Sequence, residues 1–282
     1  MTGGPRVSVI MPVLNEARRV TACLDALSAQ REAPPFEVIV VDNGSRDATP
    51  ELVRSHVMGA RLENETSRGP YAARNTGIAT ARGELVAFTD ADCLPDPRWL
   101  AEGVAVIDSG ADLAGGRIVQ MASENPSVWE RYDRATYLDQ DLYIRVERFA
   151  ATANLFVRAK VFQDLGGFVA QLTASGDQEL CQRAVRAGYR LTYASEARVL
   201  HHPRATLRDT WALHRKLGMG FSELARYGVR PKPWRDGAML LRLGTVVDQV
   251  AADGPALRRR QLGPVHAVVL MARWTGRLTR RG

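Results

Sequence analysis

The stretch "VSVIMPVLNEARRVTACLDALSAQREAPPFEVIVVD" (residues 7–42) decides the fold, because it predicts a strand, a helix and a second strand in succession. Residues 7–13 and 36–42 are nearly continuous apolar runs, which is typical of strands buried on both faces of a sheet. Between them, residues 16–30 place apolar side chains at helical spacing, at Val20, Cys23, Leu24 and Leu27. We therefore expect a parallel sheet that is covered by helices.

The alternation of strand and helix patterns continues beyond this first unit. Strands are predicted at 60–64 and 84–90, and helices at 47–57, 71–81 and 97–109. After residue 110 the pattern loosens. It predicts a strand at 112–120, a strand followed by a short helix within 152–168, a helix at 177–188 and a strand at 189–202. The expected fold class is α/β, with a mostly parallel sheet, flanking helices and a helical C-terminal extension.

Positive charge is concentrated near the C-terminus. The net charge is +7, yet residues 1–204 hold 23 basic against 26 acidic residues, whereas residues 205–282 hold 15 against 5. Such a basic segment suits nucleic acid or an anionic membrane surface. Because no nucleic-acid-binding motif is present, we do not expect nucleic acid as a partner.

Cysteine usage and the lack of export signals indicate a cytoplasmic protein. The cysteines Cys23, Cys93 and Cys181 are far apart and odd in number, so they offer no disulfide framework. Residues 1–13 lack a signal-peptide pattern, and no apolar run reaches the ~20 residues of a spanning helix. We expect a cytoplasmic location, and the basic segment raises the alternative of attachment to the inner face of the membrane.

Polar residues follow three of the predicted strands, at the edge of the sheet where open α/β folds bind ligands. The residues at these strand ends are Pro12, Asn15 and Glu16 for the first strand, Asp42, Asn43 and Gly44 for the second, and Asp90, Ala91 and Asp92 for the strand at 84–90. Each group also suits a helix N-cap or a turn. The two carboxylates at 90 and 92 repel each other, and a divalent cation is the usual group that offsets such repulsion.

Four motifs, in order, carry a resemblance to a known family. They are "VSVIMPVLNE" (7–16), "VIVVDNGSRDAT" (38–49), "GPYAARNTGIATARGELVAFTDAD" (69–92), and "GGF" (166–168) with "SGDQELCQRA" (175–184). From about residue 6 to residue 220 the chain resembles the family 2 glycosyltransferases, which are inverting enzymes with the Rossmann-like GT-A fold. The loop "PVLNEA" contains no glycine, which argues against the alternatives of a nucleotidyltransferase or a dinucleotide site.

The resemblance assigns roles to the strand-end residues. It implies that Asp90-Ala91-Asp92 is the DxD motif, in which Asp92 binds Mg²⁺ or Mn²⁺ and Asp90 lies near the ribose. It further implies a nucleotide-sugar site that includes Pro12, Asn15, Glu16, Asp42, Asn43, Gly44, Arg74 and Asn75. Asp42 matches the residue that contacts the base, and Asp90 is a second candidate ligand of the metal.

The same resemblance implies a catalytic base and an additional metal ligand. Asp177 in "SGDQELC" matches the general base, although Gly176 replaces the acid that the family usually has before it. The alternative for Asp177 is an N-cap, and the two roles are compatible. His201 or His202 would complete the metal shell; on a strand they point to opposite faces, so at most one faces the site.

The resulting expectation is an inverting, metal-dependent glycosyltransferase. Its donor would be a UDP- or GDP-linked sugar, and its acceptor a glycan or a lipid-linked hydroxyl. A catalytic domain is expected over 1–204, with a donor-binding half at about 1–110, an acceptor-side half at about 111–204, and the basic extension over 205–282. The further alternative is a non-enzymatic nucleic-acid-binding protein, but the sequence contains no nucleic-acid-binding motif.

The extension contains a short apolar helix pattern at 262–274 between basic clusters. Its apolar residues are Val265, Val268, Val269, Ala272 and Trp274, and the basic ones are Arg258–Arg260, Arg273, Arg277, Arg280 and Arg281. This pattern suits an interfacial helix that places residues 257–282 on an anionic membrane. The alternative is that the helix packs back on the catalytic domain.

Overall fold

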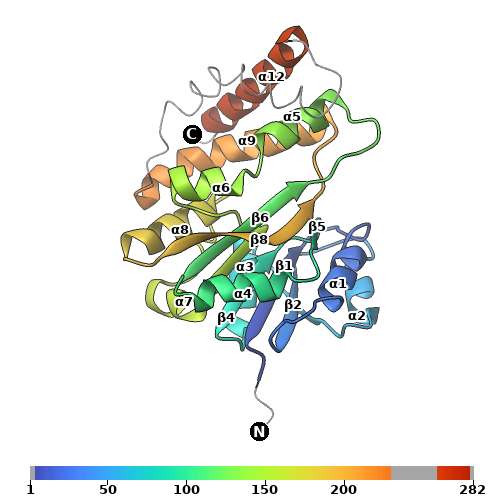
Figure 1. Ribbon diagram of the computed structural model, residues 1–282. Helices are drawn as coiled ribbons and strands as arrows, with labels where there is room; N and C mark the ends of the chain where they lie inside the picture. The colour runs from blue at the N-terminus through green and yellow to red at the C-terminus, as the bar shows by residue number, and fades with distance from the viewer. Residues whose placement is uncertain (1–3, 230–258, 280–282) are drawn as a thin grey trace. The chain divides into compact units, whose positions relative to one another are not determined.

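A computed structural model of the chain describes residues 4–229 and 259–279 (Figure 1). The described residues form an eight-stranded sheet in the order β3-β2-β1-β4-β7-β6-β8-β5. The strands are β1 (Val7–Val13), β2 (Phe36–Asp42), β3 (Arg61–Asn64), β4 (Leu85–Thr89), β5 (Cys93–Pro95), β6 (Leu113–Gln120), β7 (Asn154–Arg158) and β8 (Leu191–His201).

The sheet has a parallel half and an antiparallel half. Strand β1 pairs in parallel with β2 and β4, and β2 pairs in parallel with β3, as the sequence predicts. In contrast, β7 is antiparallel to β4 and to β6, and β5 is antiparallel to β8. The three-residue strand β5 has no counterpart among the predicted elements, because it is too short to leave a periodic pattern.

Helices occupy the predicted connections. Those that flank the sheet are α1 (Val20–Ser28), α2 (Thr49–Ser55), α3 (Pro70–Thr80), α4 (Trp99–Asp108), α7 (Ala159–Leu165) and α8 (Gly176–Arg186). Between β6 and β7 lie α5 (Val128–Thr136), α6 (Gln140–Leu142) and a π-helix at Tyr143–Glu147. The extension contains α9 (Leu207–Leu224), the 3₁₀ turn Ala225–Tyr227 and α12 (Arg259–Leu278).

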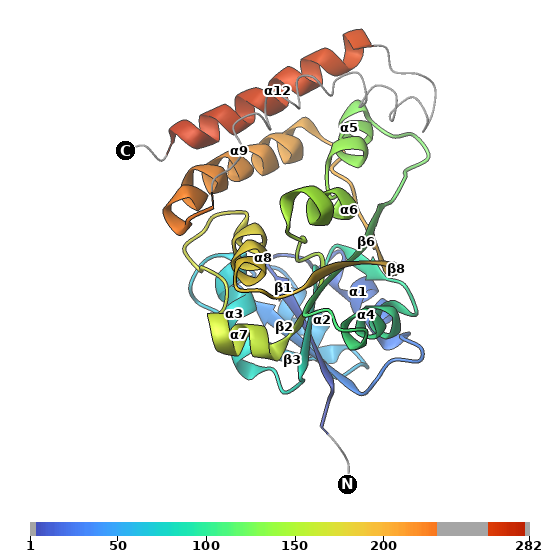
Figure 2. The ribbon, with the colours of Figure 1, turned by 60° about the vertical axis from the view of Figure 1, so that its left-hand side comes forward.

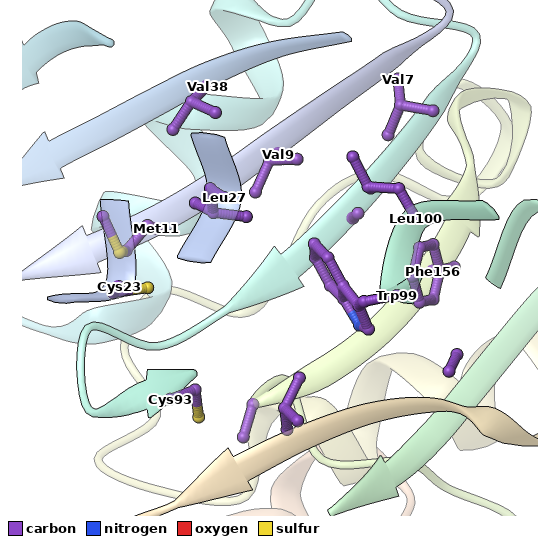
Figure 3. Packing of buried hydrophobic residues seen from close by; sticks show 14 of the residues in the cluster. Val7, Val9, Met11, Cys23, Leu27, Val38, Cys93, Trp99, Leu100 and Phe156 are labelled. Carbon is purple, nitrogen blue, oxygen red and sulfur yellow. The ribbon is translucent and has the colours of Figure 1, made fainter. Parts of the chain in front are cut away.

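Strand β1 buries side chains on both faces, which explains its continuous apolar sequence. Val7, Val9 and Met11 face α1 and α4 in the main core, together with Leu27, Trp99, Leu100 and Phe156 (Figure 3). Ile10 faces α3, where an added Cβ on Gly77 would lie 2.5 Å from its side chain. Apolar residues at consecutive positions are therefore needed to fill two separate layers.

The chain divides into two compact units. The first comprises Met1–Val119, Asp139–Gln171 and Gly176–His201, and the second Gln120–Leu138, Leu172–Ser175 and His202–Gly282. In the second unit, α9 and α12 lie side by side (Figures 1 and 2). Glycines allow this close approach, because an added Cβ at Gly218 would lie 2.1 Å from the Arg273 carbonyl oxygen.

The predicted apolar face of the C-terminal helix is divided between the interior and the surface. Val265, Val269 and Ala272 are buried within the second unit, where Val265 and Val269 pack with Tyr132 of α5. Val268 is half-buried, whereas Trp274 is 64% exposed. Arg258, Arg280 and Arg281 of the basic clusters lie outside the described residues. No helix within 4–229 or 259–279 is long and apolar enough to cross a membrane.

Candidate functional site

Parallel pairing brings the predicted strand ends to one edge of the sheet. The register pairs Val13 of β1 with Asp42 of β2, and Ile10 of β1 with Phe88 of β4. The polar residues that follow these three strands therefore leave the sheet in the same direction. Pro12 lies within β1 opposite Val41, and its side chain is half-buried.

Asn15 joins the loop after β1 to the loop after β2. Its backbone N–H donates to Ser45 Oγ at 2.9 Å, and its side-chain oxygen accepts from the Arg46 N–H at 2.8 Å. Asn15 has a φ of 58°, a left-handed conformation that asparagine tolerates better than most residues. The next residue, Glu16, donates its N–H to Thr49 Oγ1 at 2.8 Å. These bonds hold the two loops together at the candidate site.

The residues after β2 differ in how their side chains are used. The buried Asp42 carboxylate accepts from the Ser45 N–H at 3.2 and 3.3 Å. The Asn43 amide donates to the carbonyl oxygens of Glu65 and Ser67 and accepts from the N–H of Gly69. Asn43 thus holds the loop before α3 in place. Gly44 has a φ of 90° and open space around its Cβ position, so its backbone is accessible.

Arg74 of α3 pairs with the first carboxylate of the DxD segment. Its Nη2 lies 2.5 Å from Asp90 Oδ1, and the arginine is only 4% exposed. The guanidinium carbon lies 5.7 Å from the centre of the Tyr71 ring. A buried guanidinium that bonds a carboxylate is a strong, charge-assisted interaction, so Asp90 is held in a fixed position. Ala91, between the two aspartates, is buried.

Asp92 lies beside a buried histidine. Strand β5 pairs with β8 so that Cys93 stands opposite His201. As a result His201 Nε2 lies 3.6 Å from Asp92 Oδ2, and Cys93 Sγ lies 3.9 Å from Asp92 Oδ1. Of the two predicted histidines, His201 is therefore the one next to the carboxylate; His202 belongs to the second compact unit.

Negative charge accumulates around this segment. The pKa of Glu16 is raised, first by burial and then by the nearby Asp92 and Asp90 carboxylates. Burial, reinforced by Asp92, also raises the pKa of the Cys93 thiol. A bound cation would offset the repulsion among these neighbouring carboxylates. A carboxylate with an adjacent imidazole is also a donor set that fits a divalent metal.

Asp177 lies in the first turn of α8, as predicted. Its Oδ1 accepts the Gln178 N–H at 2.9 Å. Its pKa is raised, mainly by burial, although the backbone bond and the positive charge of Arg74 act in the opposite direction. A carboxylate with a raised pKa is a stronger base once it is ionised, which suits proton abstraction near neutral pH.

Tyr71 explains why glycine precedes Asp177. A Cβ added at Gly176 would lie 2.8 Å from the Tyr71 ring, closer than any ordinary carbon contact. The ring also stacks on Phe168, with centroids 5.6 Å apart. The space that a side chain at position 176 would need is therefore filled by an aromatic residue of α3. Sequence patterns did not indicate Tyr71, because the contact joins residues about a hundred positions apart.

Asn75 holds the "GGF" turn rather than presenting a free amide to a ligand. Its Nδ2 donates to the Phe168 carbonyl and its Oδ1 accepts the Phe168 N–H, both at 2.8 Å. From α8, Arg183 donates to the Gly167 carbonyl at 2.7 Å and pairs with Glu179 at 2.8 Å. The turn therefore links the helix that carries Arg74 to the helix that carries Asp177. Sequence reasoning missed Arg183, although "GGF" was a signal for this link.

Comparisons with known sequences identify relatives over most of the chain. Residues 8–166 match the family described as "Glycosyl transferase family 2". Glycosyltransferase AglE of Haloferax volcanii is 41% identical over 207 residues, which cover 71% of this chain and 68% of AglE. The pre-mycofactocin glycosyltransferase of Mycobacterium tuberculosis is 34% identical over 217 residues, covering 72% of this chain and 44% of that protein.

Solved structures share the fold. The mannosyltransferase PcManGT from Pyrobaculum calidifontis, in complex with GDP-Man and Mn²⁺, has a TM-score of 0.66 at 24% identity, covering 100% of this chain and 89% of its own. Glucosyl-3-phosphoglycerate synthase from Mycobacterium tuberculosis, in complex with Mn²⁺, UDP and glucosyl-3-phosphoglycerate, has a TM-score of 0.58 at 20% identity, covering 82% of each chain. These similarities confirm the GT-A fold.

Proposed function

Because the chain belongs to the family 2 glycosyltransferases, we propose that it is an inverting, metal-dependent enzyme that transfers a sugar from a UDP- or GDP-linked donor to an acceptor hydroxyl. The observation that carries the proposal is the geometry at the end of β4. There Asp90 pairs with Arg74, Asp92 lies 3.6 Å from His201, and the Asp177 carboxylate lies within the electrostatic influence of Arg74. Family membership favours glycosyl transfer over the nucleotidyltransferase alternative.

The donor would bind along the edge formed by the ends of β1, β2 and β4. Asp42 would accept hydrogen bonds from the base, and the open backbone at Gly44 would let the nucleotide approach closely. Arg74 and Asp90 would position the ribose and diphosphate as a fixed ion pair. The remaining members of the proposed site shape its walls: Pro12, Asn15, Glu16, Asn43, Asn75, Ala91 and Asp92. The complexes of PcManGT with GDP-Man and of the glucosyl-3-phosphoglycerate synthase with UDP support this donor class.

Asp92 and His201 would hold a divalent cation, Mg²⁺ or Mn²⁺, which would stabilise negative charge on the departing diphosphate. Asp90 is the weaker candidate ligand, because its Oδ1 is engaged by Arg74. The Mn²⁺ in the two related structures supports metal dependence. Glu16 would lie close to the cation position, since the Asp92 carboxylate is, after burial, the main cause of its raised pKa.

Asp177 would remove the proton from the acceptor hydroxyl as that oxygen attacks the anomeric carbon. One displacement inverts the configuration once, so the product would carry the opposite anomeric configuration to the donor. The raised pKa of Asp177 supports the assignment, and the positions of Asn75 and Arg183 explain how α8 is held relative to α3. We retain residues 1–204 as the catalytic domain, with a donor-binding half over about 1–110.

The acceptor class proposed is a glycan or a lipid-linked hydroxyl, without nucleic acid as a partner. A membrane-linked acceptor would make docking on anionic lipid useful, and we propose residues 257–282 as the contact. The face that supports this is exposed on α12 at Ala267, Met271, Trp274 and Leu278, which recur at helical spacing. Arg277, on the same helix, would contribute electrostatic attraction to anionic lipid.

A screen of nucleotide sugars tests the proposed function. The full chain is incubated with UDP- and GDP-linked sugars, with Mn²⁺ or with a chelator, and the released nucleotide is measured. Slow hydrolysis of one donor that requires the metal is expected, since water replaces the missing acceptor. Hydrolysis that persists with the chelator, or that is unchanged in Asp92→Asn, would contradict the metal-dependent reaction.

A further inference from the structure

A cysteine sulfur lies next to the proposed cation position. Cys93 follows Asp92 directly, and it is fully buried on β5 opposite His201 of β8. The sulfur is 3.9 Å from Asp92 Oδ1, and one ligand atom from each of the three residues lies within 4.8 Å of the others. Figure 3 shows Cys93 on its short strand, at the edge of the group of labelled core residues.

The distances are close to those of a coordinated metal. For metal–sulfur bonds of about 2.3 Å and metal–nitrogen or metal–oxygen bonds of about 2.0–2.1 Å, the ligand atoms of a tetrahedral site stand roughly 3.3–3.6 Å apart. The His201–Asp92 separation is 3.6 Å and the Cys93–Asp92 separation is 3.9 Å. His201 and Cys93 each lie within a few tenths of an ångström of such a separation from one oxygen of Asp92, and one ligand atom from each of the three residues lies within 4.8 Å of the others.

The other two cysteines have different surroundings. Cys181 of α8 is buried and its thiol lies 3.7 Å from the Ala150 carbonyl oxygen. Cys23 of α1 is buried with its thiol 3.7 Å from the Asp90 carbonyl oxygen. Cys93 is the cysteine that has both a carboxylate and an imidazole within ligand distance in the described part of the chain. A purely packing role would not require this neighbourhood.

We propose that Cys93 is a third protein ligand of the cation held by Asp92 and His201, and that the site consequently binds thiophilic cations such as Zn²⁺, Co²⁺ and Cd²⁺ more tightly than Mg²⁺. As the metal–sulfur bond forms, the cation releases a water molecule and the thiol releases its proton to the solvent. The remaining coordination positions are left for the donor diphosphate or water. This inference rests on the metal dependence of the proposed function, and it changes which metals the site prefers.

Absorption spectroscopy of the Co²⁺-loaded protein tests the ligand directly. A sulfur-to-cobalt charge-transfer band in the near ultraviolet is expected for the wild-type chain, since only a bound thiolate produces it. The band should disappear in Cys93→Ser and persist in the matched variants Cys23→Ser and Cys181→Ser. Failure of Co²⁺ to bind, binding without the band, or a band that survives in Cys93→Ser would each overturn the proposal.

Metal affinity gives a second measurement. Competition against a chromophoric chelator should show that Cys93→Ser binds Zn²⁺ at least about tenfold more weakly, with a much smaller change for Mg²⁺. An equal change for both metals would contradict a sulfur ligand. If the variant does not fold, as judged by circular dichroism, ¹¹³Cd NMR of the wild-type protein decides instead, because a sulfur ligand moves the cadmium resonance strongly downfield.

These measurements use no sugar nucleotide, so they separate two failures. A protein that shows the charge-transfer band but transfers no sugar would retain the cysteine ligand and refute the proposed enzyme activity. A protein that transfers sugar with Mn²⁺ but never shows the band would refute the cysteine ligand alone.

Discussion

Replacing Asp177 by asparagine is expected to abolish sugar transfer while donor binding remains. The asparagine side chain keeps an oxygen that accepts the Gln178 N–H, at 2.9 Å in the wild-type structure, so the start of α8 should be preserved. The amide cannot accept the proton of the acceptor hydroxyl, however. Loss of a general base slows a reaction by ~10²–10⁴-fold, which corresponds to about 2.7–5.5 kcal/mol of activation free energy.

The pH dependence of the rate provides a signature of this base. Burial raises the pKa of Asp177 in the folded protein. Because the base works only when it is ionised, kcat should fall as the pH is lowered through that raised pKa and should level off above it. The residual rate of Asp177→Asn should lack this acidic limb.

The assay compares transfer with binding in the same preparations. Transfer is measured with the donor found in the hydrolysis screen, and binding by calorimetric titration with UDP or GDP plus Mn²⁺. Asp164→Asn is the matched control, because Asp164 is an exposed carboxylate paired with Lys160 on α7. Wild-type transfer by Asp177→Asn would refute the reasoning, and loss of nucleotide binding would instead assign Asp177 to the donor site.

Three further predictions concern the metal, the glycine at position 176 and the membrane. Asp92→Asn should weaken Mn²⁺-dependent nucleotide binding about tenfold or more, because the cation loses a charged ligand; unchanged titration curves would exclude Asp92 as a ligand. Gly176→Asp, which restores the acid usual in the family, should destabilise the protein by about 1–3 kcal/mol in urea unfolding, because its Cβ meets the Tyr71 ring at 2.8 Å. Tyr71→Ala should then reduce that cost, and equal costs in both backgrounds would contradict the clash. Replacing Met271 and Trp274 by serine should reduce co-sedimentation with anionic liposomes and leave stability nearly unchanged, since both side chains are more than half exposed; salt should weaken wild-type binding. Equal binding to neutral liposomes would refute the docking proposal.

Local patterns in the sequence were sufficient for the parallel half of the sheet. Apolar runs at residues 7–13 and 36–42 predict strands because burial on both faces demands apolar side chains at every position. The helix pattern at 16–30 demands that the next strand return in parallel. Those two facts place the ends of β1 and β2 on one edge of the sheet. The same reasoning places Asp90 and Asp92 at that edge, because they come at the end of the next predicted buried strand.

The antiparallel half depended on contacts that no local pattern records. Strand β5 has three residues, yet its pairing with β8 sets Cys93 opposite His201 and brings that imidazole to Asp92. The choice between His201 and His202 therefore required the strand register, since a shift of one residue would exchange their faces.

Side-chain roles at the site were likewise divided between sequence and structure. The family resemblance implied ligand contacts for Asn43 and Asn75. A side-chain amide satisfies backbone groups equally well, and only the tertiary structure showed which groups lie within reach. For α12, periodicity alone indicated an apolar helix. Which of its apolar residues are buried was decided by the helices packed against it, because a helix with apolar side chains on more than one face is oriented only by its neighbours.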